Sequence, residues 1–258
     1  MTVLSPEDAR RGLLRAAPRL GRPTEPAATD RPHRNFYGRL KGHALKPAQR
    51  RLIEEDLAGR SPGPVGWEEN PDRVPLDLGA TFGGRDVWLE IGFGGGEHLA
   101  HQAALNPDVG IIGAEPFLNG VAMLLTKLRN FKLDNVRVHP GDARDLMDVL
   151  PPASVARAFL LYPDPWPKAR HHRRRFVTHE HLAPLARAMR PGAELRVATD
   201  IPDYVRQTLL EVPRQGFAWT AERAADWRKP WQDWTRTRYE AKAVREGRVP
   251  HYLTFRRA

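Results

Sequence analysis

The sequence predicts an α/β fold whose sheet is mostly parallel. Between residues 86 and 210, short apolar segments alternate with longer segments whose apolar residues recur at helical spacing. A glycine cluster separates the first of these apolar segments from the first amphipathic one. Strands that alternate with helices pair in parallel and are covered by helices on both faces, so one α/β domain is expected.

The elements follow one another in a regular order. The expected strands are Asp86–Ile91, Val109–Ala114, Asn135–His139, Val155–Leu161 and Glu194–Ala198. The expected helices are Pro47–Ala58, Glu97–Leu105, Asn119–Leu128, a segment after Asp142, His179–Met189 and Asp203–Leu210. Asn106-Pro107 ends the second of these helices, because proline cannot continue it. Phe217–Ala221 and His251–Phe255 are expected as late strands at an antiparallel edge.

The N-terminal residues 1–34 differ from the rest of the chain. They are rich in Arg, Pro, Ala and Thr and contain few apolar residues, so they cannot bury enough surface to offset the entropy lost on ordering. We expect a basic, disordered arm over residues 1–34 and a folded domain over residues 35–258.

Charge and composition restrict the classes of function. The formal net charge of +10 favours an anionic partner, since basic surface attracts phosphate groups. The chain has no cysteine, which excludes disulfides and thiolate chemistry. It contains no apolar run long enough to cross a membrane and no signal-peptide pattern, so a cytoplasmic protein without a membrane partner is expected.

The densest motif is Glu90-Ile91-Gly92-Phe93-Gly94-Gly95-Gly96-Glu97, where the first strand ends. Glycines there let the backbone approach a nucleotide-like ligand closely. A dinucleotide fingerprint requires glycine where Glu97 stands, which argues against a nicotinamide cofactor. Glu115 after the second strand suits ribose hydroxyls, and Asp142 after the third suits an adenine edge. Each alone has a structural alternative as a turn or cap, but the set in this order predicts a ligand site.

A second motif, Leu161-Tyr162-Pro163-Asp164-Pro165-Trp166-Pro167-Lys168, follows the fourth strand. Its prolines fix φ, so Asp164 and Trp166 are presented from a stiff backbone, which suits catalysis by positioning. The alternative is a proline-rich turn with a solvated Asp. The strongly basic run 168–175 lies beside this loop, and we interpret it as a phosphate-binding segment rather than a solvated face.

These motifs resemble two nested protein families. The first acid, the glycine loop and the second acid are similar to those of class I S-adenosylmethionine-dependent methyltransferases. That resemblance implies a Rossmann-like, seven-stranded, mostly parallel sheet with an antiparallel last strand. Pro-Asp-Pro-Trp-Pro-Lys and the basic run closely resemble the bacterial tRNA (guanine-N7-)-methyltransferases. Ala198-Thr199-Asp200 and the segment 235–240 are further matches, and the similarity extends from about Arg34 to Arg257.

The resemblance implies a function and roles for individual residues. It implies methyl transfer from S-adenosyl-L-methionine to N7 of a guanine in the tRNA variable loop, at position forty-six. It implies no obligate protein partner and leaves monomer and homodimer open. The implied cofactor residues are Glu90, Gly92, Gly94, Gly96, Glu115, Asp142 and Asp164, of which Asp164 is also catalytic. The implied substrate residues are Lys168, Asp200, Thr237, Arg238, Tyr239 and Glu240. The implied RNA contacts are Arg170, His171, His172, Arg173, Arg174 and Arg175.

This chemistry needs no strong base. N7 of guanine carries a free lone pair and loses no proton before it attacks a sulfonium methyl group. A carboxylate such as Asp164 or Asp200, accepting from N1–H and the exocyclic amine, would orient the base and stabilise its developing positive charge. From the sequence alone, Asp200 fits a helix N-cap equally well.

Two side-chain clusters each have two interpretations. Trp227, Trp231 and Trp234 could stack on RNA bases, but aromatic residues in a late segment favour packing. His98 with His101, and the histidines between 171 and 181, could suggest a metal site. No carboxylate stands at ligand spacing and arginines crowd the second group, so no metal is expected.

Two other functions compete with this prediction. Amino methyltransferases that act on adenine or on protein side chains carry an Asp/Asn-Pro-Pro-aromatic loop, whereas the order here is Pro-Asp-Pro-Trp. An RNA-binding module could keep the fold without turnover, but the intact glycine loop and Asp164 argue against it.

Overall fold

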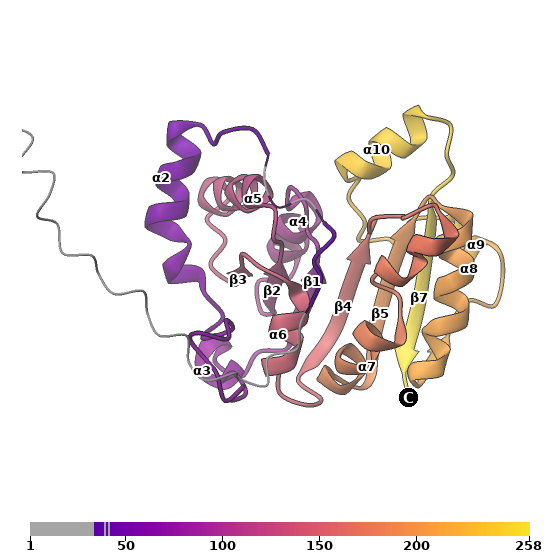
Figure 1. Cartoon of the computed structure of the whole chain (residues 1–258), viewed down its shortest axis with the longest axis horizontal. Helices are drawn as coiled ribbons and strands as arrows, with labels where there is room; N and C mark the ends of the chain where they lie inside the picture. Colours follow the sequence, from indigo (N-terminus) through magenta and orange to yellow (C-terminus); the bar gives the residue numbers. More distant parts are fainter. Residues whose placement is uncertain (1–33, 39, 41) are drawn as a thin grey trace, which may run out of the picture. The chain divides into compact units, whose positions relative to one another are not determined.

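The fold is built around parallel strands (Figure 1). The structure, a computed structural model, describes residues 34–38, 40 and 42–258. The arm expected over residues 1–34 therefore lies outside the described residues, apart from Arg34 at its end.

The sheet has seven strands in the order β3-β2-β1-β4-β5-β7-β6. They are β1 (Val87–Ile91), β2 (Gly110–Ala114), β3 (Val136–His139), β4 (Val155–Leu161), β5 (Met189–Thr199), β6 (Phe217–Trp219) and β7 (His251–Arg257). Strands β1 to β5 pair in parallel, whereas β7 runs antiparallel to both β5 and β6. The predicted seven-stranded sheet with an antiparallel last strand is confirmed.

The parallel strands end level with one another. Ile91 at the end of β1 pairs with Ala114 at the end of β2, and Ala114 pairs in turn with His139 at the end of β3. On the other side of β1, Ile91 pairs with Leu160 near the end of β4. The loops that follow these strands consequently leave the sheet at one edge, where open α/β sheets bind their ligands.

Helices cover both faces of the sheet, each over its own core. On one face lie α2 (Pro47–Asp56), α4 (Glu97–Leu105) and α5 (Leu118–Asn130). On the other lie α3 (Leu78–Phe82), α6 (Ala143–Val149), α7 (His179–Ala188) and α8 (Pro202–Glu211). Leu99 and Leu124 are fully buried on the first face, and Leu146 and Leu185 on the second. Each such leucine contributes about 1.5–3 kcal/mol through burial, so both faces are firmly covered.

The C-terminal elements complete the edge that carries the loops. After β6 the chain forms α9 (Ala225–Arg228) and α10 (Arg238–Arg245) before it returns as β7. Figure 1 shows α10 beyond the upper ends of β4 and β5, on the side where those strands end. No helix in the described part of the chain is long and apolar enough to cross a membrane.

Several elements differ from the prediction. β5 begins at Met189, earlier than expected, because Met189 pairs with Val155 before the Pro-Gly turn signal is reached. The first predicted helix ends at Asp56 and continues as a short 3-10 helix, η1 (Ala58–Arg60). The short elements α3, α9, η2 (Ala169–Arg174) and η3 (Pro213–Gln215), together with α10, were not predicted. Short helices carry too little periodicity to be detected against tertiary packing.

Candidate active site

The glycine loop curves tightly between β1 and α4. Gly92, Gly94 and Gly96 all have a left-handed backbone, with φ of 69°, 56° and 70°. This conformation is open to glycine and costly for other residues. A Cβ placed on Gly92 would meet no atom of the described part of the chain within 4 Å, so open space lies beside the loop. Such a cradle fits a ligand that contacts the backbone directly.

Glu115 follows β2 and closes one side of this cradle. Its Oε2 accepts a hydrogen bond from the Gly94 amide at 2.7 Å, and its Oε1 accepts one from the Phe117 amide at 2.9 Å. Burial raises the pKa of Glu115, and the negative charges of Asp164 and Glu90 raise it further. The structure thus brings together three acids that leave three different strands.

Glu90 is held by a partner that the sequence did not reveal. The Nδ1 atom of His98, in the first turn of α4, lies 2.7 Å from Oε2 of Glu90, and both side chains are almost fully buried. His98 Nε2 is buried and has no hydrogen-bond partner among the residues that the structure describes, and the ring lies edge-on to Phe159. A buried Nε2 proton would be unsatisfied, so the favoured tautomer carries its proton on Nδ1 and donates to Glu90. This hydrogen bond ties α4 to the end of β1.

Asp142 takes the N-cap position of α6. Its Oδ1 accepts from the Arg144 amide at 2.9 Å, and its carboxylate also accepts from the Arg144 guanidinium. Arg144 in turn donates to the carbonyl of Asn35 at 3.1 Å. Arg144 therefore links Asp142 to the segment that precedes α2. The predicted contact of Asp142 with an adenine ring stays a prediction.

The loop after β4 carries Asp164 between two residues with unusual backbone. Tyr162 and Trp166 have φ of 49° and 39°, a region that bulky residues rarely occupy. Backbone strain of this kind is found at functional sites, where the surrounding structure holds it in place. The Asp164 side chain is accessible, but surrounding protein atoms partly desolvate the carboxylate and so raise its pKa.

Trp166 in this loop is surrounded by aromatic and cationic groups. The Tyr37 ring stands edge-on to it with centroids 6.0 Å apart, and the His171 ring does so at 5.9 Å. The Arg174 guanidinium lies 4.5 Å from the Tyr37 centroid and 5.0 Å from that of Trp166. Contacts of this type stabilise the loop by cation–π attraction. Nothing in the sequence of residues 35–38 signals that they reach this loop.

The basic run 168–175 divides into exposed and structural residues. Lys168, Arg170 and Arg173 are exposed. Arg175 is 1% exposed and donates to Asp203 at 2.8 Å and to Gln207 at 2.8 Å, so from this position it cannot reach an RNA phosphate. The structure therefore differs from the expectation that Arg175 contacts RNA, because its buried guanidinium joins the basic run 168–175 to α8.

The C-terminal motif also divides by role. Thr237 caps α10 by accepting from the Glu240 amide at 3.2 Å. Glu240 is 4% exposed and accepts from the Trp234 indole and the Tyr252 hydroxyl, which makes it part of the core. Arg238 pairs with Glu97 at the start of α4. The exposed Tyr239 places its ring against Gly94, so α10 lies beside the glycine loop.

Asp200 does not cap a helix. The N-cap of α8 is Ile201, without a side-chain hydrogen bond, whereas the Asp200 carboxylate pairs with Arg248 at the start of the segment leading to β7. The predicted substrate contact of Asp200 stays a prediction, and the N-cap interpretation is wrong.

The tryptophan cluster packs, as the sequence favoured. Trp231 and Trp234 lie on one core beside Tyr252, and Trp227 stacks on His251 at the other. The Trp231 indole donates to Thr254 Oγ1 at 2.8 Å. Within the described residues, no group of three or more His, Asp or Glu side chains is arranged to hold a metal ion.

The Glu90–His98 contact gives a first prediction. His98→Leu removes the donor and leaves a buried carboxylate unpaired, which costs about 1–3 kcal/mol. We expect the affinity for the ligand of the glycine loop to fall about tenfold. His98→Asn keeps a donor near Nδ1 and should recover part of that loss. Calorimetric titration of both variants checks this, and equal loss in both would show that His98 acts only by filling space.

The sequence and the fold are similar to those of known proteins. A family model described as "Putative methyltransferase" matches residues 84–253. The chain is 74% identical over 228 residues to the tRNA (guanine-N(7)-)-methyltransferase of Ruegeria pomeroyi, covering 88% of this chain and 96% of the relative. It is 74% identical over 225 residues to the protein of the same name from Roseobacter denitrificans, covering 87% and 97%. The solved structure of the 16S rRNA methyltransferase KamB has a TM-score of 0.53 at 20% identity, covering 70% of this chain and 93% of that one. This last likeness concerns the fold alone.

Proposed function

The chain belongs to the tRNA (guanine-N(7)-)-methyltransferase family, and from this premise we propose how its site works. It transfers a methyl group from S-adenosyl-L-methionine to N7 of a guanine in tRNA. The observation that carries the site assignment is the convergence of Glu90, Glu115 and Asp164 at one edge of the sheet. We place the target guanine in the variable loop, at position forty-six, on family resemblance.

The residues present fit the methyl donor. Open space beside Gly92 leaves room for a ligand against the backbone. Glu115 already has one lone pair of each oxygen engaged by a backbone amide, and its remaining lone pairs suit the two ribose hydroxyls. Glu90 and Asp164 supply negative charge for the amino and sulfonium groups, and Asp142 borders the adenine end. When bound, the donor supplies an electrophilic methyl group on sulfur.

The reaction balances without any proton transfer. The lone pair of guanine N7 forms a bond to the methyl carbon while the carbon–sulfur bond breaks and its electrons return to sulfur. Positive charge passes to the purine, and no proton leaves. Asp164 is placed to stabilise that charge from the loop after β4, because a preorganised carboxylate needs no rearrangement as charge develops. Its strained, proline-bounded loop holds the carboxylate in a fixed direction.

Two groups of residues hold the substrate near the Asp164 carboxylate: some contact it directly, and others position those that do. We assign direct contact to the accessible side chains, Lys168 and Tyr239. Thr237, Arg238 and Glu240 support this position by fixing α10 against the glycine loop. Asp200 borders the site as the partner of Arg248.

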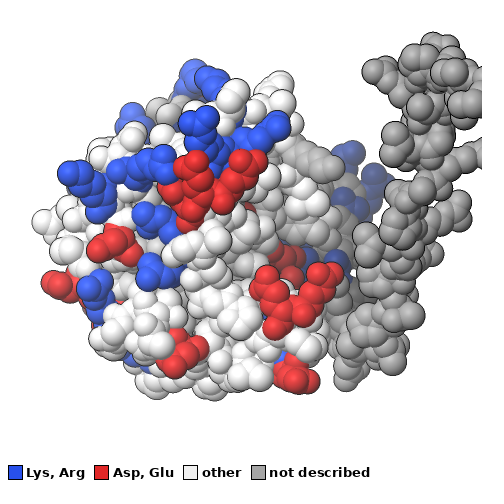
Figure 2. Space-filling model, turned by 90° about the vertical axis from the view of Figure 1, so that its left-hand side faces the viewer, with Lys and Arg blue, Asp and Glu red and all other residues white. Residues whose placement is uncertain are grey.

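The exposed cations of the basic run are the proposed RNA contacts, chiefly Arg170 and Arg173. The net charge of +10 is not spread evenly over the surface, because the face on the α2 side carries both basic and acidic side chains (Figure 2). A cytoplasmic location follows from the proposed tRNA substrate. We propose that the chain works without an obligate protein partner, as a monomer or homodimer.

The product identifies the reaction. Purified protein, unmodified tRNA and methyl-labelled donor should yield labelled 7-methylguanosine on nucleoside mass spectrometry. Cleavage at 7-methylguanine after chemical reduction should locate it in the variable loop. Label on adenine or on the exocyclic amine of guanine would overturn the proposed function.

A further inference from the structure

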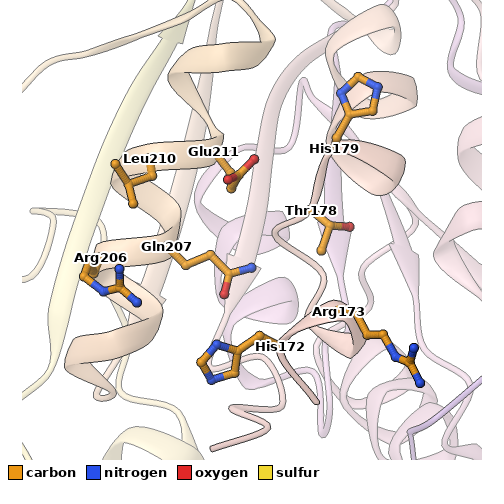
Figure 3. Close-up of a pocket in the computed structure, with 8 residues that line it drawn as sticks. All are labelled: His172, Arg173, Thr178, His179, Arg206, Gln207, Leu210 and Glu211. Atoms are coloured by element: carbon orange, nitrogen blue, oxygen red, sulfur yellow. The ribbon is translucent and has the colours of Figure 1, made fainter. Parts of the chain in front are cut away.

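A groove of about 420 Å³ lies between η2, the start of α7 and α8 (Figure 3). One wall is α8, with Arg206, Gln207 and Leu210. The other wall is formed by His172 and Arg173 of η2 and by His179 at the start of α7. We propose that this groove binds the sugar-phosphate backbone of the tRNA, as an extension of the proposed RNA contacts beside the loop after β4. The inference rests on the proposed function.

The floor of the groove is fixed by hydrogen bonds within the protein. Arg175, which follows η2, donates to the Asp203 carboxylate and to the side-chain oxygen of Gln207, both on α8. The Gln207 amide nitrogen then donates to the Val177 carbonyl at 2.6 Å. In Figure 3 Gln207 extends from α8 toward the opposite wall. Because these contacts join both walls, the groove is a preformed part of the fold.

The rim of the groove is cationic. Arg206 has a side chain that is 67% exposed, and its guanidinium shares Asp203 with other cations through a contact of 2.9 Å. Arg173 is exposed at the outer edge of the opposite wall. Glu211, the one acid among the described residues that line the groove, is paired with Arg214 at 2.7 Å. Asp203, behind the lining, is shared by Arg206, Arg175 and His172. Four guanidinium groups, those of Arg173, Arg175, Arg206 and Arg214, stand against the two carboxylates, so an incoming anion meets an excess of positive charge.

The lining favours a polyanion over a small organic ligand. Leu210 is the one large apolar side chain that faces the groove among the described residues that line it. Pockets for small organic ligands are mostly apolar and enclosed, whereas this groove is polar and open to solvent. A polyanion that crosses the surface and keeps most of its hydration fits such a lining. The groove is also linked to the loop after β4 through η2, which follows that loop directly and carries Arg170 near its start and Arg173 near its end.

Arg206→Ala is the direct test. We expect tRNA affinity to fall roughly three- to tenfold and the slope of log affinity against log salt to flatten by about one unit. The affinity for S-adenosyl-L-methionine should stay unchanged. Arg223→Ala is the matched control, because Arg223 is exposed and forms the same kind of ion pair with a residue on its own segment, but does not line the groove.

A variant of opposite sign makes the test two-sided. Leu210→Arg adds a cation to the groove and should strengthen tRNA binding and steepen the salt dependence. Equal behaviour of Arg206→Ala and Arg223→Ala, with no gain from Leu210→Arg, would overturn the inference. If the wild-type protein still forms 7-methylguanosine in tRNA, that result leaves the proposed function intact. Absence of 7-methylguanosine with the wild-type protein would instead overturn the proposed function itself.

Discussion

Asp164→Asn should lower the turnover number about 100-fold or more while leaving tRNA affinity nearly unchanged. The substitution keeps the shape of the side chain and removes its negative charge. That charge is used as positive charge develops on the purine, so its loss raises the barrier more than it weakens binding. Single-turnover kinetics with saturating donor and tRNA measure the effect. Full activity would remove Asp164 from the mechanism and leave the substrate class untouched.

The pH dependence of activity should differ between the wild-type protein and Asp164→Asn. Partial desolvation raises the pKa of Asp164 above its ordinary value. The ionised form is the active one, so wild-type activity should decline as the pH falls through this raised pKa and stay level above it. No basic limb is expected near neutral pH beyond what RNA binding imposes, because N7 loses no proton. Asp164→Asn should lack the acid limb, and a pH series at fixed ionic strength checks both features.

Gly94→Val should abolish binding of S-adenosyl-L-methionine. Gly94 has φ of 56°, a conformation that a β-branched residue adopts only with strain. A Cβ there would lie 2.8 Å from Cε2 of Tyr239, and the added methyl groups would enter the ligand cradle. The Gly94 amide also donates to Glu115, so a shift of the loop would misplace the carboxylate assigned to the ribose. Calorimetry should detect no donor binding.

The control for this variant separates local strain from loss of the site. Gly192 has a left-handed φ of 79°, and a Cβ there would meet no protein atom within 4 Å. Gly192→Val therefore carries comparable backbone strain far from the glycine loop along β5, and it should bind the donor normally. Thermal unfolding of both variants shows whether they fold. Normal donor binding by a folded Gly94→Val would contradict the assignment of this loop as the cofactor cradle.

The spacing of apolar residues along the sequence was sufficient to predict the strands of the sheet and its main helices. Strand β4 and helix α4 have the predicted bounds, because a run of apolar residues and a helical segment that stops at Asn106-Pro107 are both local patterns. The antiparallel last strand was implied by family resemblance, and the register of β7 against β5 bears it out. Short elements such as η2 were missed because their shape depends on contacts made by Arg175 with α8.

The sequence by itself determined which chemical groups this protein places at strand ends. The order of Glu90, Glu115 and Asp164 along the chain, with glycines after the first, is a local property, and parallel pairing brings the three together. Tertiary structure alone decided which groups remain available. Arg175 and Glu240 belong to motifs that resemble binding segments, yet both are buried by partners distant in sequence. Burial depends on how separate elements pack, and a buried charge persists only where such partners satisfy it, which no local pattern records.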